Sequence, residues 1–304
     1  MPKKVKKAVI VAAGLGKRMF PFTKVDSKLL IPILNKPIVL YLIEELHDSG
    51  ITDVIIVTNH SSKLRELFKK NPKLNQILEK IERSDLVKQL HIIENLCKIN
   101  YIKQEEPRGW LHAVYLAKDF IKNEPFVVLF SDCLYKSKIS ATKQVIKEYY
   151  EHNKNIISNA RFLFKPKIFN LCKNIDFPLG EDIADSVLIN KLREKKDILN
   201  YQINGKMYDI GDPVQLLRTL LTFTLEDWYY SHKLKEFLIT DKNLRKDFEN
   251  FYEIIKKTEN NCKLIVNKAI KSNKLLNEIK EFKNLSRVEQ EKCWNIYQRG
   301  LKKI

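Results

Sequence analysis

The sequence has no uninterrupted run of about 18 apolar residues, which is the length that an α-helix needs to cross a membrane. We therefore expect no membrane partner. The N-terminus is basic, and the apolar stretch that follows it, residues 7–13, is short. This stretch leads into glycines rather than into a cleavage site made of small residues, so we interpret it as a first β-strand and not as a signal peptide.

Cysteine is scarce and scattered along the chain. The five cysteines form no Cys-x-x-Cys pair and are odd in number, which argues against a disulfide framework and against a zinc site. Thiols of this kind are typical of a reducing compartment, so the sequence predicts a cytoplasmic protein. The five residues are Cys97, Cys133, Cys172, Cys262 and Cys293.

The chain also lacks a recognisable nucleic-acid-binding motif, although its formal net charge is +18. Positive charge favours nucleic acids and phosphate-rich ligands alike. The lysines are spread along the whole chain rather than gathered in one segment. We therefore expect no nucleic-acid partner, and a basic nucleic-acid-binding protein is the most remote of the alternatives.

The first sixty residues predict the fold class. Residues 7–12 are short, apolar and followed by glycines, as a buried parallel strand is. In residues 37–49 the apolar side chains recur on one face of a helix, and Gly50 ends it. Residues 53–58 form a second apolar strand. A strand, a helix and a strand, with a glycine loop after the first strand, indicate an α/β fold with a doubly wound, mostly parallel sheet.

The remaining pattern predicts two parts. After about residue 212 glycine is absent until Gly300, and apolar residues recur at helical spacing between charges. We expect an α/β domain over 1–212 and a helical C-terminal region over 213–304, through which the chain could form a homo-oligomer. Within the first part we expect two helices over 62–95, helices over 111–122, 141–151 and 183–193 and from near Pro166, and strands over 99–103, 126–130 and 161–164 and near Tyr208.

A glycine loop, Ala-Ala-Gly-Leu-Gly-Lys-Arg at residues 12–18, follows the first strand directly. Glycines let a backbone approach a phosphate group and point N–H groups at it. The loop lacks the third glycine of a dinucleotide fingerprint, because Met19 stands there, and Arg18 replaces the Ser or Thr of a Walker loop. On these residues alone, an ordinary strand-to-helix turn is an equally open reading.

The next segment, residues 21–37, makes the loop specific. It contains a proline, then Ser-Lys-Leu-Leu-Ile-Pro, then a second Lys-Pro. With the preceding Gly-x-Gly-x-Arg, this order resembles the sugar-phosphate nucleotidyltransferases, and most closely the bacterial UTP–glucose-1-phosphate uridylyltransferases. The one departure is Ser27, where that family usually has proline.

This resemblance implies roles for the loop. It implies that the nucleotide is bound by Ala12, Ala13, Gly14, Leu15 and Gly16. Two cations would then act in catalysis, because a guanidinium at Arg18 and an ammonium at Lys28 can neutralise charge on the phosphates. The alternative is that Arg18 and Lys28 are surface cations.

A third segment, residues 104–113, resembles the uridylyltransferase stretch Gln-x-x-Pro-x-Gly-Leu-Gly-His-Ala. The resemblance implies that Gln104 and Gly109 bind the base, and an amide both donates and accepts, as a uracil edge requires. Leu111 replaces a glycine of that stretch, which would place a bulky side chain beside the base. We interpret His112 as structural rather than catalytic.

Trp110 and the helices before this third segment also bear on the resemblance. Trp110 is bulkier than the usual leucine and is interpreted as a core residue. The helices expected over 62–95 resemble an insert of the uridylyltransferases that related thymidylyl- and adenylyltransferases lack. This insert is the main reason to expect UTP rather than another triphosphate.

Two aspartates complete the implied site. Asp132 follows the strand at 126–130, and Asp209 lies in Tyr-Asp-Ile-Gly, which resembles the family's Tyr-Asp-x-Gly. The resemblance implies that both hold a metal ion, and two carboxylates with phosphate oxygens suit Mg²⁺. Both end expected strands of a parallel sheet, where ligands collect, so we expect them to lie close together. A lone carboxylate after a strand is otherwise often a helix cap.

One family motif is missing. Family members carry Glu-Lys-Pro, whose side chains bind the sugar and its phosphate, between the helix matching 141–151 and the strand matching 161–164; no Glu-Lys-Pro occurs in this sequence. The resemblance therefore implies an enzyme that transfers UMP from UTP to a sugar 1-phosphate, with Mg²⁺ and with reduced activity. The alternative is a catalytically impaired nucleotide-binding relative that acts as a regulatory or interaction protein.

Overall fold

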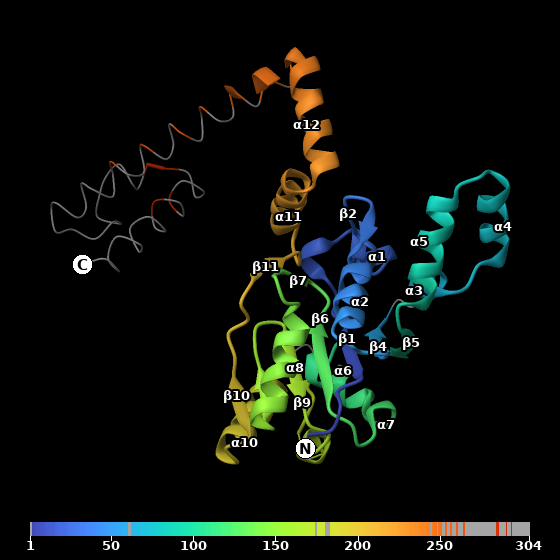
Figure 1. Cartoon of the computed structure of the whole chain (residues 1–304). Helices are drawn as coiled ribbons and strands as arrows, with labels where there is room; N and C mark the ends of the chain where they lie inside the picture. Colours follow the sequence, from blue (N-terminus) through green and yellow to red (C-terminus); the bar gives the residue numbers. More distant parts are fainter. Residues whose placement is uncertain are drawn as a thin grey trace. The chain divides into compact units, whose positions relative to one another are not determined.

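The computed structural model describes residues 2–59, 62–173, 175–179 and 183–243, and isolated positions beyond 243. The chain divides into two compact units, Met1–Phe223 and Thr224–Ile304. The first unit contains the sheets, and helix α12 (Trp228–Thr240) belongs to the second (Figure 1). Beyond residue 243, the predicted helical region 213–304 lies almost wholly outside the described residues.

The first unit is built on a seven-stranded sheet with the order β10-β8-β9-β6-β1-β4-β5. Strand β1 pairs in parallel with both β4 and β6, and β5 extends the sheet in parallel beyond β4. Strand β9 alone runs antiparallel to its neighbours, between β6 and β8. The expected mostly parallel sheet is thereby confirmed. The strands are β1 (Lys7–Val11), β4 (Asp53–Thr58), β5 (Lys98–Lys103), β6 (Phe126–Phe130), β8 (Asn155–Ile157), β9 (Arg161–Phe164) and β10 (Ile198–Asn200).

Helices cover both faces of this sheet, because successive side chains of a strand point to opposite faces. On β1, Ala8 and Ile10 pack in one cluster with the apolar faces of α2 and α8. Val9 packs in a second cluster with α6, α7, α9 and α10. The fold is therefore doubly wound. These helices are α2 (Ile38–Asp48), α6 (Gly109–Leu116), α7 (Lys118–Ile121), α8 (Ala141–His152), α9 (Ile168–Cys172) and α10 (Ile183–Glu194).

The helical part of the expected insert differs from the sequence prediction. Residues 62–95 form three helices rather than two: α3 (Ser62–Phe68), α4 (Pro72–Lys80) and α5 (Ser84–Asn95). Helix α4 starts at Pro72, and the side chain of Asn71 accepts a hydrogen bond from the Leu74 amide at 3.0 Å. An Asn-Pro start of this kind is a recognised beginning of a helix, so the sequence contained the signal.

Several short strands were not predicted. They include β7 (Cys133–Lys136), β2 (Pro32–Ile33) and β3 (Lys36–Pro37), of which β2 pairs with β3. Strand β7 forms a separate antiparallel ribbon with β11 (Lys206–Asp209), the strand expected near Tyr208. The expectation that Asp209 ends a strand of the parallel sheet is wrong, because β11 belongs to the ribbon. Its register nevertheless pairs Asp209 with Cys133, the residue after Asp132. The ribbon therefore brings the two aspartates together by another route.

Helix α11 (Pro213–Glu226) begins where the helical region is expected to begin. Its residue Phe223 packs edge-to-face on Tyr41 of α2 at 5.6 Å and on Tyr208 of β11 at 5.4 Å between ring centroids. The first part of α11 thus belongs to the sheet unit. No helix in the described ranges is both long and apolar enough for a membrane span.

A buried ion pair ties the first unit together. Arg161 of β9 is fully buried, and its guanidinium donates to both carboxylate oxygens of Glu45 on α2, at 2.9 and 2.7 Å. Glu45 also accepts hydrogen bonds from the backbone and hydroxyl of Thr142 in the first turn of α8. Arg161 donates further to the Cys133 carbonyl at 3.1 Å. Burial raises the pKa of Glu45, but the attraction and hydrogen bonds of Arg161 outweigh it, so the net pKa lies below 4.5.

We predict that Arg161→Met destabilises the protein by about 3–5 kcal/mol in urea unfolding, because it leaves a buried carboxylate without its partner. The pH dependence of the free energy of unfolding should also reverse. In the wild type the contribution of Glu45 is complete above pH 4.5 and is lost as pH falls through its lowered pKa. In the variant burial, the largest influence on Glu45, is opposed only by the two hydrogen bonds from Thr142, so the pKa of Glu45 is raised and stability increases as pH falls.

A matched control is Lys69→Met, which removes an exposed ion pair to Glu66 with an N–O distance of 3.8 Å. Exposed pairs of this kind add little to stability, so the free energy of unfolding should not change measurably. Equal effects of the two substitutions would contradict the role of the Glu45–Arg161 pair.

Candidate nucleotide site

A pocket of the sheet unit with a volume of about 500 Å³ lies beyond the carboxyl ends of β1 and β6. The chain winds from β1 outward to β4 and β5 and then returns to β6 on the other side of β1. Ligands of doubly wound sheets bind at such a reversal of strand order. The lining residues are Val11, Ala13, Gly14, Leu15, Gly16, Lys17, Arg18, Lys28, Gln104, Pro107, Gly109, Trp110, Ala113, Phe130, Ser131, Asp132 and Gly211.

All of the predicted site residues line this pocket except Ala12 and Asp209. Ala12 is buried, and its amide donates to the Val57 carbonyl at 2.8 Å, so it continues the sheet beyond β1. Asp209 lies next to the lining residue Gly211, whose amide donates to its Oδ1 at 2.7 Å. The structure thus gathers in one place segments that are up to two hundred residues apart in the sequence.

The two glycines of the loop differ in their surroundings. Gly16 has a φ of +58°, and a Cβ there would lie 2.6 Å from the Thr23 methyl carbon, so neither the backbone nor the space suits another residue. The same threonine donates from its hydroxyl to the Gly16 carbonyl at 3.0 Å. A Cβ on Gly14 would meet nothing within 4 Å. Gly16 therefore shapes the loop, whereas Gly14 leaves open the space above the loop.

Lys28 sits in a short 3₁₀ turn, Lys28–Leu30. The hydroxyl of Ser27 caps this turn by accepting from the Leu29 amide at 3.3 Å, which gives the residue that departs from the family pattern a local structural role. The Lys28 Nζ lies 2.7 Å from Oδ2 of Asp132, and both side chains are largely buried. Lys28 therefore faces the pocket rather than the solvent.

Asp132 is ionised in this setting. Burial raises its pKa, but the charge of Lys28 and its hydrogen bond outweigh the burial, with a smaller contribution from Arg18, and the net pKa is lowered. The adjacent thiol behaves differently, because burial, reinforced by Asp132 and Asp209, raises the pKa of Cys133 to about 12. The site thus presents a carboxylate beside a protonated thiol.

Three charged side chains converge on Gly211. A Cβ at this glycine would lie 2.6 Å from the Arg18 Nη2, 3.0 Å from Oδ1 of Asp209 and 3.3 Å from Oδ2 of Asp132. Any side chain at position 211 would displace them. The two carboxylates supply only oxygen donors around one small volume, which fits a hard divalent cation. Because both carboxylate oxygens lie within 3.3 Å of this one point, Asp132 and Asp209 lie close together.

Arg18 has a second partner that sequence reasoning missed. Its Nη1 lies 3.4 Å from Oδ2 of Asp212. The other oxygen of Asp212 accepts from the amides of Val214 and Gln215, both at 3.0 Å, and so caps helix α11. The Asp-Pro pair at 212–213 is a recognised start of a helix, which is the signal by which this residue could have been found.

The opposite end of the pocket is formed by the turn before α6. Gln104 is buried, and its amide nitrogen donates to the Gly109 carbonyl at 3.2 Å and lies 2.9 Å from Nδ1 of His112. Gly109 has a φ of +81°, a conformation that favours glycine. The interpretation of His112 as structural rather than catalytic agrees with its position behind Gln104 and outside the lining of the pocket.

Leu111 faces the core, whereas Trp110 packs against the core and also lines the pocket. Leu111 is only 1% exposed and packs in the core cluster with Val9 and Ile55, so the expectation of a bulky side chain beside the base is wrong. Trp110 lines the pocket and also stacks on Phe162 at 5.2 Å between ring centroids. Consecutive residues of a helix point about 100° apart, so one faces the core and its neighbour the pocket, and the sequence motif alone does not show which is which.

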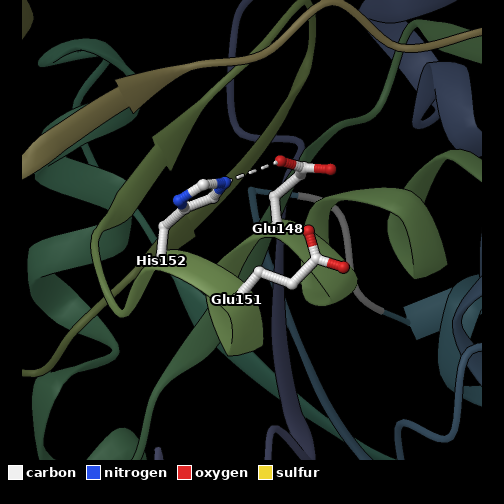
Figure 2. Close-up of side chains that lie close together, drawn as sticks. All are labelled: Glu148, Glu151 and His152. Atoms are coloured by element: carbon white, nitrogen blue, oxygen red, sulfur yellow. Dashed lines mark ion pairs between the residues drawn. The ribbon is translucent and has the colours of Figure 1, made fainter.

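Among the described residues, one further group of side chains could offer several ligands to a metal. Glu148, Glu151 and His152 lie on the last turns of α8, with ligand atoms within 4.8 Å of one another (Figure 2). The His152 Nε2 lies 3.5 Å from a Glu148 oxygen, and Glu151 pairs with Lys147 at 3.6 Å. Pairs one turn apart on an exposed helix face explain the group without a ligand.

Comparison with known proteins agrees with this geometry. The family model described as nucleotidyl transferase matches residues 7–158. A UTP–glucose-1-phosphate uridylyltransferase of Staphylococcus saprophyticus is 31% identical over 281 residues, covering 77% of this chain and 98% of that protein. This chain belongs to the nucleotidyl transferase family. The corresponding Bacillus subtilis enzyme is 32% identical over 282 residues, covering 78% of this nucleotidyl transferase and 97% of that protein.

Solved structures share the fold. A UTP-bound UGPase from Acinetobacter baumannii matches with a TM-score of 0.70 at 22% identity, covering 78% of this nucleotidyl transferase and 100% of that chain. The chain is therefore a nucleotidyltransferase enzyme with the fold of this structure. Enzymes of this family generally use a divalent metal ion.

We predict that substitutions at the two glycines of the nucleotidyl transferase loop affect different properties, stability at Gly16 and nucleotide binding at Gly14. Gly16→Ala should destabilise the fold by about 1–2 kcal/mol, because it strains a left-handed residue and presses on Thr23. Gly14→Ala should leave the urea unfolding midpoint unchanged and weaken the calorimetric binding of a nucleoside triphosphate, because its methyl group enters open space over the loop. Similar losses of stability in both variants would contradict this division of roles.

Proposed function

We propose that this chain is a UTP–glucose-1-phosphate uridylyltransferase, which transfers UMP from UTP to glucose 1-phosphate and releases pyrophosphate. The observation that carries the proposal is one pocket lined by a glycine loop, three cations (Lys17, Arg18 and Lys28), a carboxylate and a buried amide. The names of the Staphylococcus and Bacillus relatives support this substrate pair. The two substrates would be the main partners of the chain.

The reaction needs no nucleophile from the protein. An oxygen of the sugar phosphate forms a bond to the α-phosphorus of UTP, and the bond from that phosphorus to the bridging oxygen of pyrophosphate breaks. Negative charge builds up on the leaving pyrophosphate, and Arg18 and Lys28 are the cations placed to neutralise it. Ala13, Gly14, Leu15 and Gly16 would hold the triphosphate through backbone amides, and Gln104 and Gly109 would hold the base.

The residues fit Mg²⁺ as the divalent ion. Asp132 and Asp209 would hold it, since their oxygens face the same volume over Gly211 and no softer donor than oxygen is offered by either. When bound, the ion would supply positive charge next to the phosphate oxygens. Removal of the ion by a chelator should abolish pyrophosphate release, and Mg²⁺ should restore it.

We predict that Arg18→Ala lowers the rate of pyrophosphate release from UTP and glucose 1-phosphate by roughly 10- to 100-fold, the effect of one charge-assisted contact. The control is Arg83→Ala, which removes an exposed arginine that pairs with Asp85 two residues away, at 2.7 Å. It should leave the rate unchanged. Equal rates for wild type and Arg18→Ala would contradict the role of Arg18.

We also propose that the sugar half of the site is reduced. Helix α8 ends at His152 and strand β8 starts at Asn155, so the connection to β9 holds only a three-residue strand and a turn. The match to the Staphylococcus saprophyticus enzyme extends over 281 residues but covers 77% of 304 residues, about 234, here. Roughly 47 positions of that enzyme therefore have no counterpart in this chain. This difference supports an internal deletion that includes the Glu-Lys-Pro segment.

One cation near this junction, Lys165, already has partners within the protein. Lys165, which directly follows β9, forms an ion pair with Asp197 and donates to the Asn153 carbonyl. It is therefore engaged in local structure. We predict a Michaelis constant for glucose 1-phosphate that is elevated by orders of magnitude, because each lost ionic contact is worth about 1.5–3 kcal/mol. Steady-state kinetics of pyrophosphate release would measure it, and a Michaelis constant in the usual micromolar range would refute the reduction.

The short connection also favours one alternative, a nucleotide-binding relative with impaired catalysis that acts through its helical C-terminal region. Binding of UTP without turnover across a panel of sugar 1-phosphates would select this alternative. We place either activity in the cytoplasm, which the free thiols of Cys97, Cys133 and Cys172 support.

A further inference from the structure

Asp132 presents one of its two carboxylate oxygens to two different neighbours. The Lys28 Nζ lies 2.7 Å from its Oδ2. The same Oδ2 faces the volume over Gly211 that Asp209 also faces, and it lies 3.3 Å from the position of a Cβ on that glycine. The other oxygen, Oδ1, lies 3.7 Å from the Cys133 thiol. The ammonium of Lys28 is therefore bonded to the oxygen that is placed to hold a divalent ion together with Asp209.

The Lys28 ammonium and a divalent ion would repel each other at this oxygen. Mg²⁺ binds oxygen at about 2.0–2.1 Å, so an ion on Oδ2 of Asp132 would lie less than about 5 Å from the Lys28 nitrogen. The side chains of Lys28 and Asp132 are only 16% and 25% exposed, so water and salt screen this repulsion weakly. An ion therefore binds Asp132 at low cost only when Lys28 has left it.

Lys28 has no second carboxylate partner in the part of the chain that the structure describes. Its one ion pair there is with Asp132. Arg18 differs, because it pairs with Asp212 and so has a carboxylate away from Asp132. A largely buried ammonium that leaves its partner is unfavourable unless another anion accepts it. The triphosphate that the pocket is proposed to bind offers such oxygens.

We propose that Lys28 excludes the divalent ion from Asp132 until a triphosphate binds, so that the ion and the nucleotide bind together. The proposal rests on the proposed function, in which Asp132 and Asp209 hold the ion. A phosphate oxygen accepts the Lys28 ammonium, and Oδ2 of Asp132 is then released to the ion. Each ligand strengthens the binding of the other by the same factor, because the two effects are one coupling free energy.

The test measures the dissociation constant of Mn²⁺, used alone as the probe, by electron paramagnetic resonance with the full chain and no nucleotide. Lys28→Met removes the ammonium, so Mn²⁺ should bind about tenfold more tightly, a factor of the usual size for coupled sites. Lys28→Gln removes the charge but can still donate to Asp132, so it should show the same gain even if Lys28→Met fails to fold. Lys28→Arg keeps a positive charge beside Asp132 and should bind Mn²⁺ as weakly as the wild type.

Lys17→Met is the matched control for the loss of one positive charge. Lys17 lines the same pocket, and it forms no ion pair with a described residue. Its removal leaves Asp132 paired with Lys28, so the Mn²⁺ affinity should change by less than about twofold. Equal Mn²⁺ affinities of the wild type, Lys28→Met and Lys28→Gln would overturn the proposal, and so would an equal gain in Lys17→Met.

A double variant shows where the probe binds. Asp132→Asn in the Lys28→Met background should remove the gain, because the gain requires the carboxylate that Lys28 releases. A gain that persists would place the Mn²⁺ elsewhere, for example on the exposed group of side chains at the end of α8, and would refute the proposal.

These outcomes are separable from the proposed reaction, because Mn²⁺ binding needs no turnover. A wild-type protein that releases no pyrophosphate would refute the proposed transfer, and a gain in Lys28→Met that Asp132→Asn removes would still support exclusion of the ion by Lys28. A wild-type protein that transfers UMP, with an Mn²⁺ affinity that Lys28→Met does not alter, would refute the exclusion alone.

Discussion

The structure depends on the position of β1 between two parallel partners. Its backbone is hydrogen-bonded to β4 on one side and to β6 on the other, and helices cover both faces. The residues that follow β1 are therefore open to a ligand only at the carboxyl edge of the sheet. The glycine loop lies at this edge because it directly follows β1. The segments that end β5 and β6 meet it at the same edge, which is why one pocket collects a loop, an amide and a carboxylate.

The charged groups in and behind the pocket are held by a series of ion pairs and hydrogen bonds. Lys28 neutralises Asp132, and Arg161 donates to the carbonyl of Cys133 directly after it. Arg161 is in turn neutralised by Glu45, which also holds the first turn of α8. Each buried charge thus has an opposite partner, as burial demands. The segment that carries the site aspartate is consequently held by an ion pair that does not line the pocket.

Sequence reasoning found the long, regular elements and the residues of the phosphate loop. The apolar strands and the helix starting at Ile38 have strong periodicity, and the glycine loop adjoins the first of them. It missed β7, β8, β10 and the ribbon position of Asp209, because strands of three or four residues carry too little pattern to be recognised. It could not tell that Leu111 faces the core, since a motif gives no helix rotation. The contact of His112 with Gln104 depends on a turn that brings back a residue eight positions later.

Asp212 links the pocket to the helix that follows it. Its two oxygens have separate tasks, because Oδ2 pairs with Arg18 while Oδ1 receives the first amides of α11. A phosphate that draws Arg18 to itself leaves the full negative charge of Asp212 to the amino end of the helix, where a carboxylate is worth about 0.3–1 kcal/mol. The start of α11 is thereby coupled electrostatically to the arginine of the glycine loop.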